Sequence, residues 1–408
     1  MEKLVHFSEA CQVVMAAAAG RDLPVECVGL SAAQNRVLAA PQVSQEDLPQ
    51  ADNSAMDGYC VRHADIAGAR ADVPVTLPVS GRILAGHPQV ELPSGTAMYI
   101  ATGGLIPPGA DTVIKIEDIT ESADEKTISL ISPPPLGAYI RRRGKDLQAG
   151  HQVLNPGTLI NPAVIGILAG IGRMVVPVFR KPRVAVLTSG DEVMMPFEPV
   201  QPWQVRNANT SVLSAQVREA GGEPLDFGIV RDETGLAVAR IREALSSADV
   251  VVTCGGVSLG KKDPFIDAFR ELAIEKRVHG VSLKPGKPFF FGMLDGKPVF
   301  GLPGNQASCS VTFELFVRPF LTRLLQQTDP DRPTLFLPLA SPIRNPSGRD
   351  HFFRARLETR DGKNVVQPLA TQDSHLLTSM LGARLLVRQP AAEKEWPAGK
   401  EVACLLIE

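Results

Sequence analysis

Apolar positions follow two different spacings along this chain, and the changes between them mark its regions. Residues 7–19 carry apolar side chains at helical spacing, with Ser8 as the expected N-cap. Between about 47 and 146 the apolar runs are short, alternate with polar positions and are broken by glycine and proline, which indicates a β-rich insert. Residues 163–171 return to a helical pattern, and the segment 180–182 is typical of a linker.

From 183 to about 327, strand patterns and helix patterns alternate. This alternation predicts a mostly parallel sheet with helices on both faces and ligands at the carboxyl ends of its strands. After residue 329 the pattern is strand and turn, which predicts a small barrel or sheet. The expected strands are 183–187, 225–230, 249–254 and 299–300, and the expected helices are one capped by Asn209, one over 235–245, one starting at Asp263-Pro264 and one over 305–325.

Together these patterns predict a multidomain α/β plus β protein. At 408 residues, the chain is too long for a single ordinary core. The predicted domains are a discontinuous helical or linker domain (1–46 and 147–180), a β-rich inserted domain (47–146), a central doubly wound, mostly parallel α/β domain (181–329) and a C-terminal β-barrel-like domain (330–408).

Composition narrows the classes of function. A formal net charge of −2 argues against a general nucleic-acid binder. No apolar run approaches 18 residues, and the N-terminus lacks a basic region followed by an apolar core, so we expect neither membrane insertion nor export. The six cysteines are far apart without a CxxC pair, which indicates neither a zinc site nor a disulfide framework. A reduced cytoplasm is the expected location.

Three glycine-containing turns follow apolar runs within one stretch of the α/β region, at 255–260, 284–288 and 301–305. Glycine lets backbone N–H groups approach an anion closely, and Lys284 and Lys287 flank the second turn. Each turn alone has a structural alternative: a tight turn at 255–260, a solvated lysine pair at 284–288, and an N-cap at Asn305 in the turn at 301–305. Their combination in one α/β unit favours a phosphate-binding role.

Carboxylates also follow the expected strand ends: Asp191 and Glu192, then Asp232, then Asp263. Acids beside anion-binding turns point to a phosphorylated ligand held with a divalent metal ion. Two structural alternatives stay open. Asp263 stands where a helix N-cap belongs, and Asp232 has Arg231 as a neighbour for a surface ion pair.

Other patterns are less specific. The residues at 52–59 are dense in turn formers, and the basic run 141–143 suits either an oxyanion or a solvated surface. The seven histidines show no HxxH or HxxxH spacing, so no histidine metal site is indicated. Walker A and GxGxxG patterns are absent, which argues against P-loop enzymes and dinucleotide binders, and the GxSxG string at 256–260 does not stand out from the first glycine turn as a serine hydrolase signal.

Eight segments then occur in a familiar order: DNSAMDGY at 52–59, ATGG at 101–104, IRRRGKD at 140–146, TSGDE at 188–192, RDE at 231–233, GGVSLG at 255–260, KPGKP at 284–288 and GLPGN at 301–305. This series resembles the molybdopterin molybdenumtransferases, the MoeA and gephyrin E-domain family. The likeness extends over nearly the whole chain.

The resemblance implies four domains and a homodimer whose active sites lie between the α/β domain of one subunit and the β-rich domain of the other. It also implies a reaction in which adenylylated molybdopterin and molybdate give molybdenum cofactor and AMP, assisted by Mg²⁺ or another divalent metal ion. A molybdopterin adenylyltransferase is a candidate partner. Neither nucleic acid nor a membrane is expected as a partner.

The same resemblance carries roles onto matching positions of this sequence. The catalytic candidates are Asp57, Thr102, Asp146, Glu192 and Lys284. The substrate-binding candidates are Gly255, Gly256, Ser258, Lys287, Gly304, Asn305, Ser308, Arg354 and Ser374, of which Lys284, Ser308, Arg354 and Ser374 match the family's oxyanion pocket. The metal-binding candidates are Asp232 and Asp263.

This chain also departs from the family pattern. Gln306-Ala307 precede Ser308 where proline is usual, and Lys261-Lys262 precede Asp263. Glutamine there removes the preset φ of proline and restores an N–H donor, and the lysines add positive charge beside the metal candidate. Two alternatives to molybdate insertion stay open: a paralogue that handles tungstate, and a non-catalytic protein that binds the cofactor or acts as a scaffold.

Overall fold

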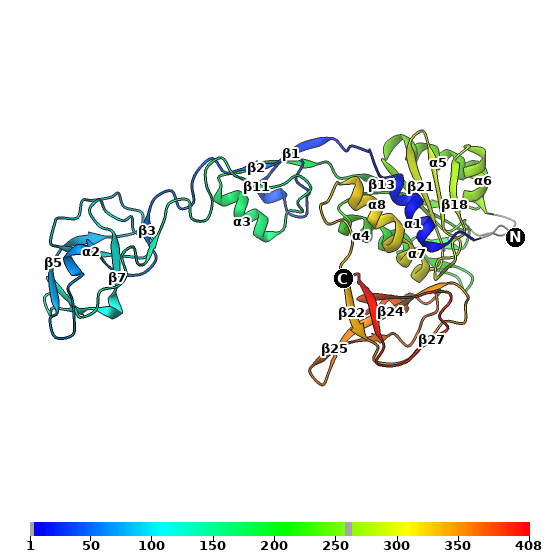
Figure 1. Ribbon diagram of the computed structural model, residues 1–408. Coiled ribbons are helices and arrows are strands. Elements are labelled where there is room, and N and C mark those ends of the chain that lie inside the picture. The colour runs from blue at the N-terminus through cyan, green and yellow to red at the C-terminus, as the bar shows by residue number, and fades with distance from the viewer. Residues whose placement is uncertain (1–3, 258–262) are drawn as a thin grey trace. The chain divides into compact units, whose positions relative to one another are not determined.

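A computed structural model describes residues 4–257 and 263–408 of the chain (Figure 1). Its contacts divide the chain into two compact units. The larger unit holds the chain up to Ala40, Pro156–Ile165 and Met174–Glu408, and the smaller holds Pro41–Asn155 and Gly166–Arg173. The four domain boundaries given above stay a prediction.

The larger unit is built on a six-stranded sheet with the strand order β16-β13-β17-β21-β20-β18. The first four strands of this order are parallel to one another, whereas β20 pairs antiparallel with both β21 and β18. The predicted, mostly parallel α/β sheet is therefore confirmed. The strands are β13 (Arg183–Ser189), β16 (Glu223–Val230), β17 (Val250–Cys254), β18 (Glu275–His279), β20 (Phe290–Leu294) and β21 (Lys297–Leu302).

Both faces of this sheet are buried, because successive side chains of a strand point to opposite faces. On β13, Val184 and Val186 enter one apolar cluster, whereas Ala185 and Leu187 enter another. Figure 1 shows helices on both sides of the sheet. The first cluster includes side chains from α1 (Phe7–Ala16), α4 (Ala208–Glu219), α7 (Gln306–Thr312) and α8 (Arg318–Leu324), and the second from α5 (Thr234–Ser247) and α6 (Pro264–Glu271).

Two of the predicted helix caps are wrong. The first helix begins at Phe7 after an extended His6, so Ser8 already lies inside the first turn, where its backbone cannot adopt the extended conformation of a cap. The helix predicted to start at Asn209 is capped two residues earlier by Asn207, whose side chain accepts a hydrogen bond from Thr210 N–H.

The helix predicted over 305–325 is continuous in the chain but not uniform. It consists of α7, a π-helical turn at Phe313–Val317 and α8. Asn305 occupies the N-cap position, yet its side chain makes no capping hydrogen bond. Apolar spacing predicted the helical stretch but not the wider turn, because a π-turn changes the backbone pairing and leaves the composition of the sequence unaltered.

The C-terminal part of the larger unit forms a second sheet, with the order β19-β24-β26-β28-β22 and β25 paired to β24. Its apolar side chains pack in their own cluster, as expected for the predicted β-barrel-like domain. β19 (Leu283–Lys284) joins this sheet, parallel to β24, and not the central one. The other strands are β22 (Thr334–Pro338), β24 (Asp350–Arg360), β25 (Lys363–Pro368), β26 (Leu385–Gln389) and β28 (Glu401–Leu406), beside the pair β23 (Ile343–Arg344) and β27 (Glu395–Trp396).

Further short elements complete the larger unit. β1 (Val25–Gly29) pairs antiparallel with β12 (Val175–Phe179) as a two-stranded ribbon. β14 (Val193–Met194) pairs parallel with β15 (Val205–Arg206) ahead of α4. Single 3₁₀ turns lie at Leu30–Ala32 and Leu377–Met380.

The smaller unit is rich in β-structure, as the alternating pattern predicted. Its main sheet has the order β7-β4-β6-β5-β9-β8, and two strand pairs, β10-β3 and β11-β2, accompany it. The strands are β2 (Gln42–Val43), β3 (Asn53–Ser54), β4 (Gly58–Val61), β5 (Val75–Ile83), β6 (Ala97–Ile100), β7 (Thr112–Lys115), β8 (Thr120–Glu121), β9 (Thr127–Leu130), β10 (Ile140–Arg141) and β11 (Gln152–Leu154). The helical elements are α2 (His63–Ile66) and the 3₁₀ turn Ile116–Asp118, and α3 (Pro162–Gly170) belongs partly to each unit.

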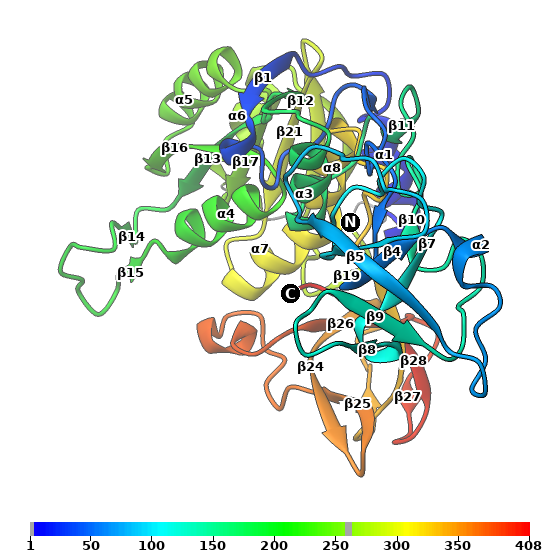
Figure 2. The ribbon, with the colours of Figure 1, turned by 90° about the vertical axis from the view of Figure 1, so that its left-hand side faces the viewer.

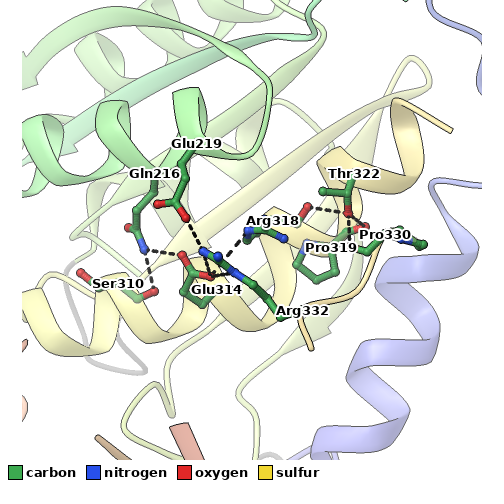
Figure 3. Close-up of polar contacts among 9 residues, drawn as sticks. All are labelled: Gln216, Glu219, Ser310, Glu314, Arg318, Pro319, Thr322, Pro330 and Arg332. Carbon is green, nitrogen blue, oxygen red and sulfur yellow. Dashed lines mark hydrogen bonds and ion pairs between the residues drawn. The ribbon is translucent and has the colours of Figure 1, made fainter. Parts of the chain in front are cut away.

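A polar network ties the central helices to the segment that leads into the C-terminal sheet (Figure 3). Glu314, in the π-turn, is 6% exposed and accepts hydrogen bonds from Gln216 and from Arg332. Arg332 also pairs with Glu219, so it connects α4, the π-turn and the start of the C-terminal region. Buried charges of this kind are stable only when they are paired.

Two sequence expectations concern features of the whole chain. All six cysteines are free thiols, in agreement with the expected lack of a disulfide framework. None of the helices in the described ranges combines the length and the apolar character that crossing a membrane would need.

Candidate functional site

A pocket of about 730 Å³ lies at the carboxyl edge of the parallel strands of the central sheet. Residues that follow β13, β17 and β21 line it, so it occupies the place that the strand–helix alternation predicted. The predicted site residues that it brings together are Glu192, Asp232, Gly255, Gly256, Asp263, Gly304 and Asn305.

Close packing explains the glycines of the first turn. Gly255 and Gly256 both have positive φ, +81° and +58°, which L side chains rarely adopt. A Cβ atom on Gly256 would lie 2.6 Å from Ser189 Oγ, and one on Gly255 would lie 3.0 Å from Ser189 O. The turn therefore packs directly against the end of β13. Ser258, in the same turn, lies outside the described residues.

The turn after β21 lies beside the turn after β17. A Cβ atom on Gly304 would lie 3.4 Å from the Cα atom of Gly255. Asn209, in the first turn of α4, donates from Nδ2 to the carbonyl oxygen of Gly304 at 2.7 Å. Two of the three predicted glycine turns thus face one pocket, and a helix holds one of them in place.

The carboxylates on one side of the pocket lie close enough together to act on one another. Asp232 N–H donates to Asp191 Oδ1 at 3.1 Å, so the two carboxylates are held close together. Burial and then the neighbouring Asp191 and Glu192 raise the pKa of Asp232 above its ordinary value. Arg231 forms no ion pair with Asp232. It donates to the carbonyl oxygens of Asp191 and Val193 at 3.0 and 3.2 Å.

Asp263 combines a structural role with a place in the pocket. It is 6% exposed, and its Oδ1 accepts a hydrogen bond from Ile266 N–H at 3.4 Å as the N-cap of α6. The predicted cap with Pro264 at the first helical position is confirmed. Asp263 also lines the pocket with Asp232, so capping does not remove it from the site.

The chemistry of the pocket suits a magnesium ion that is held partly by a ligand. Within residues 4–257 and 263–408, there is no cluster of three or more His, Cys, Asp or Glu side chains that could hold a metal by itself. Mg²⁺ usually binds through one or two carboxylates together with substrate phosphates and water. Asp232 and Asp263 fit this mode, and their role as metal ligands stays a prediction.

The KPGKP turn contributes less to this pocket than the two glycine turns. Pro288 lines it, whereas Lys284 and Lys287, both half-buried, do not. Lys284 lies on β19 and pairs in register with His351 of β24. The turn therefore lies where the central sheet meets the C-terminal sheet, and the oxyanion role of the two lysines stays a prediction.

Arg354, on β24, holds the loop at 371–379. Its side chain is fully buried, donating from Nε to Ser379 O at 3.1 Å and from Nη2 to the carbonyl oxygens of Thr371 and Asp373. Burial lowers the pKa of Arg354 to about 10. These contacts make Arg354 a positioning residue for the loop, while its Nη1 has no hydrogen-bond partner.

The same loop lies against the start of α7. Ser374 O accepts from Ala307 N–H at 3.3 Å, and Ser374 Oγ accepts from Asn305 Nδ2 at 3.4 Å. Ser308 follows at the next position of α7 and is 4% exposed. Arg354 and Ser374, which are far from Asn305 and Ser308 in sequence, are thereby brought to one place.

Among the lining residues that the sequence analysis did not predict as site residues are Arg206, Asn207, Asn209 and His375. Two of them come from the β14–β15 excursion and its junction with α4, which Figure 2 shows extending beyond the edge of the central sheet. They follow neither a glycine turn nor a predicted strand end, so no local pattern marked them. The path of the chain after β13 brings Arg206, Asn207 and Asn209 to the pocket, and the loop at 371–379 brings His375.

The remaining candidates lie in the smaller unit. Asp57 Oδ1 accepts hydrogen bonds from Thr102 N–H at 2.6 Å and from Thr102 Oγ1 at 2.9 Å. These two bonds, the backbone one first, lower the pKa of Asp57 below its ordinary value. Asp146 is exposed, and its N–H donates to Leu48 O at 2.9 Å. Asp57 and Thr102 thus form a pair, and the structure does not pair Asp146 with them.

The basic run at 141–143 is largely neutralised. Arg142 Nη1 donates to Asp52 Oδ2 at 2.6 Å, and Arg143 pairs with Asp47. Both acids come from the segment that precedes β4, so these ion pairs join the chain entering the β-rich insert to the chain leaving it. The alternative of a free oxyanion site at Arg142 and Arg143 is therefore not favoured.

Comparisons with known proteins address the family. Three family models match consecutive parts of the chain: the MoeA N-terminal region (domains I and II) over residues 5–172, a probable molybdopterin binding domain over 185–323 and the MoeA C-terminal region (domain IV) over 337–407. The pocket described above lies mostly in the part that the second model matches.

Relatives and solved structures agree along the entire length. A molybdopterin molybdenumtransferase from Synechococcus elongatus is 34% identical over 98% of each chain, and molybdopterin molybdenumtransferase 2 from Mycobacterium tuberculosis is 35% identical over 92% of this chain and 93% of its own. The crystal structure of a molybdopterin biosynthesis moeA protein from Pyrococcus horikoshii OT3 covers 99% of this chain and 100% of its own, with a TM-score of 0.85 at 27% identity. Because identity at this level extends over all parts of the fold, the chain belongs to the molybdopterin molybdenumtransferase family.

Proposed function

We propose that this chain inserts molybdate into adenylylated molybdopterin and releases AMP, with Mg²⁺ or another divalent ion assisting. The broader activity follows from the family: the chain is a transferase of molybdenum cofactor biosynthesis. The identity of the adenylylated substrate, the release of AMP and the metal ion are the parts that we propose.

One observation carries the proposal. Two glycine turns, which suit phosphate, and three carboxylates, which suit a divalent cation, line one pocket of about 730 Å³. A nucleotide-linked pyrophosphate with its counter-ion has both of these requirements. A neutral ligand would gain nothing from Glu192, Asp232 and Asp263 together, and a free phosphate without a cation would be repelled by them.

The residues of the pocket then have distinct tasks. The backbone N–H groups of Gly256 and Gly304 bind phosphate oxygens, while Gly255 N–H donates to Leu302 O and so holds the start of the first turn against β21. Asp232 and Asp263 would hold the metal ion, which supplies Lewis-acid polarisation of the pyrophosphate when bound. Arg354 and the loop it holds place Ser374 beside Asn305, where we propose that molybdate enters with the help of Lys284.

We further propose a cytoplasmic homodimer in which Asp57, Thr102 and Asp146 of one subunit complete the site of the other. Exposed apolar side chains on the β1–β12 ribbon support a subunit contact: Val25, Met174 and Val175 are 56, 67 and 60% exposed. A molybdopterin adenylyltransferase is a candidate partner that would deliver the adenylylated substrate.

Release of AMP tests this function directly. Purified protein is mixed with adenylylated molybdopterin, MgCl₂ and molybdate, and AMP is measured by chromatography. AMP formation that depends on both Mg²⁺ and molybdate is expected. No AMP above a protein-free control would reject the proposal and favour a protein that only binds the cofactor. Tungstate in place of molybdate tests the choice of oxyanion in the same assay.

A further inference from the structure

Arg206, which the sequence analysis did not single out, brings a positive charge to the lining of the pocket. Three carboxylates line it, but Lys284 and Lys287 do not. Among the described residues of the lining, Arg206 is the only lysine or arginine. A phosphate group that enters beside Glu192 and Asp232 needs a cation of the protein as well as a metal ion, because like charges repel strongly where water is partly excluded.

The backbone of the β14–β15 excursion fixes where Arg206 starts. β15 runs parallel to β14, with Val205 N–H donating to Glu192 O at 2.9 Å and Asn207 N–H donating to Met194 O at 2.8 Å. Arg206 therefore lies between two backbone hydrogen bonds, immediately before the cap of α4. Its Cα position is determined by the same chain segment that carries the catalytic candidate Glu192.

One hydrogen bond to the backbone orients the guanidinium of Arg206. Its Nε donates to Pro196 O at 3.1 Å, and in the part of the chain that the structure describes it forms no ion pair. Two other arginines of the larger unit differ: Arg231 donates to backbone carbonyls, and Arg332 pairs with two glutamates. Neither terminal nitrogen of Arg206 has a partner within residues 4–257 and 263–408, and this planar fork matches two oxygens of a phosphate.

We propose that Arg206 binds a phosphate group of the nucleotide-bearing substrate at the wall of this pocket. The inference rests on the proposed function and adds a residue that determines affinity for the phosphate. The ligand chemistry is a phosphate ester, which AMP and the adenylyl half of the substrate share. Inorganic phosphate has the charge without the nucleoside, and adenosine has the nucleoside without the charge.

Binding of AMP to the full-length protein tests the inference, measured by calorimetry in the presence of MgCl₂. Trp203 gives a second signal, because it lies three residues before Arg206 and is 72% exposed, whereas the other tryptophan, Trp396, is 7% exposed. Arg206→Gln is expected to weaken AMP binding roughly 10- to 100-fold, the range for loss of one charge-assisted contact. Arg206→Lys is expected to recover part of the affinity, since it restores the charge but not the fork.

The matched control is Arg218→Gln. Arg218 is also exposed and belongs to the same region of the chain, but it lies in the last turn of α4, roughly 15 Å along the helix from its first turn, and does not line the pocket. The Arg218→Gln variant loses the same charge outside the pocket. It is expected to bind AMP as tightly as the unmodified protein does. Thermal denaturation of all variants checks that folding is retained.

Adenosine and inorganic phosphate show whether a loss of AMP affinity comes from the nucleoside or from the phosphate. Adenosine binding is expected to be unchanged by Arg206→Gln, and inorganic phosphate binding is expected to weaken with AMP. The inference is overturned if the unmodified protein binds no AMP, if Arg206→Gln binds AMP as tightly as Arg218→Gln, or if adenosine loses as much affinity as AMP.

The AMP-release assay distinguishes a failure of this inference from a failure of the proposed function. Arg206-dependent AMP binding in a protein that releases no AMP would reject the function and leave the phosphate contact standing. Turnover with an unchanged KM in Arg206→Gln would reject the contact and leave the function standing.

Discussion

Asp232 at the pocket and Glu314 in the polar network are carboxylates with the same direction of pKa shift in two different surroundings. Burial is the largest cause of the raised pKa at both. At Asp232 the next cause is another carboxylate, Asp191, which raises the pKa further. At Glu314 the next causes are Arg332 and Arg318, which lower it. At the pocket the neighbouring carboxylates thus outweigh the nearby Arg231, whereas in the network two arginines act on the one carboxylate.

This difference separates a ligand site from a structural one. The network of Glu314 contains its own cations and hydrogen-bond donors, Gln216 among them, and connects three segments of the larger unit (Figure 3). At the pocket, Asp232 forms no ion pair with any described residue, and the nearby Arg231 acts on its pKa less than burial and Asp191 do. A bound cation would relieve the repulsion there, whereas the network has no need of one.

The largest expected effect is on folding, from Arg332→Met. Arg332 is the cation whose charge acts most strongly on Glu314, and their side chains are only 12 and 5% exposed. Its loss leaves a buried carboxylate poorly compensated and is expected to lower the free energy of unfolding by about 3 kcal/mol at neutral pH. Urea denaturation measures this change.

A double variant controls for the packing change at Arg332. Glu314→Gln in the Arg332→Met background removes the carboxylate that lost its partner and is expected to restore most of the stability. Equal stability of Arg332→Met and the unmodified protein would show that the network does not contribute to folding.

At the pocket, Asp232→Asn is expected to act on chemistry and not on folding. Loss of a metal-binding carboxylate is expected to reduce AMP release roughly 100-fold, equivalent to about 2.7 kcal/mol of activation free energy. Stability is expected to be equal or slightly higher, because the amide removes repulsion with Asp191. Steady-state kinetics and thermal denaturation of the same preparation measure both; a large loss of stability would contradict this assignment.

Helix α4 allows a smaller matched test, because its first residues line the pocket and its last turns enter the network. Asn207→Ala removes the cap of α4, and Gln216→Ala removes the donor to Glu314 and to Ser310 O. Each is expected to cost about 1 kcal/mol of stability. Only Asn207→Ala is expected to weaken AMP binding. Equal effects of both on AMP binding would mean that the two ends of α4 are not functionally distinct.

The smallest expected effect is a pH dependence of stability set by Glu314. Its pKa is raised in the folded protein, so the stability of the protonated form is present below the ordinary pKa of glutamate and is lost as pH rises through the raised value. Glu314→Gln imitates the protonated form. It is expected to match the unmodified protein in acid and to become the more stable of the two as pH rises, in urea denaturation between pH 4 and 8. A parallel pH dependence of both proteins would show that Glu314 is not shifted.

The helices and strands of the α/β region followed from spacing, because both faces of a parallel sheet and one face of each helix must be apolar. The pair Asp263-Pro264 also marked its helix start correctly. The caps predicted at Ser8 and Asn209 were each wrong by two residues, since several polar residues near each start suit a cap equally well. Which one serves depends on where the backbone leaves its extended path.

By itself, the sequence determined the family, the order of elements and the glycine and acid types of the pocket. The order of elements depends on the local spacing of apolar residues. The family and the residue types of the pocket depend on short motifs of glycine and acidic residues, which can be read directly from the chain. The tertiary structure alone decided that Arg206 enters the pocket, that Lys284 joins the C-terminal sheet and that Arg354 holds the loop of Ser374. Such contacts join residues far apart in the chain, and their energies arise only when folding removes water from between them.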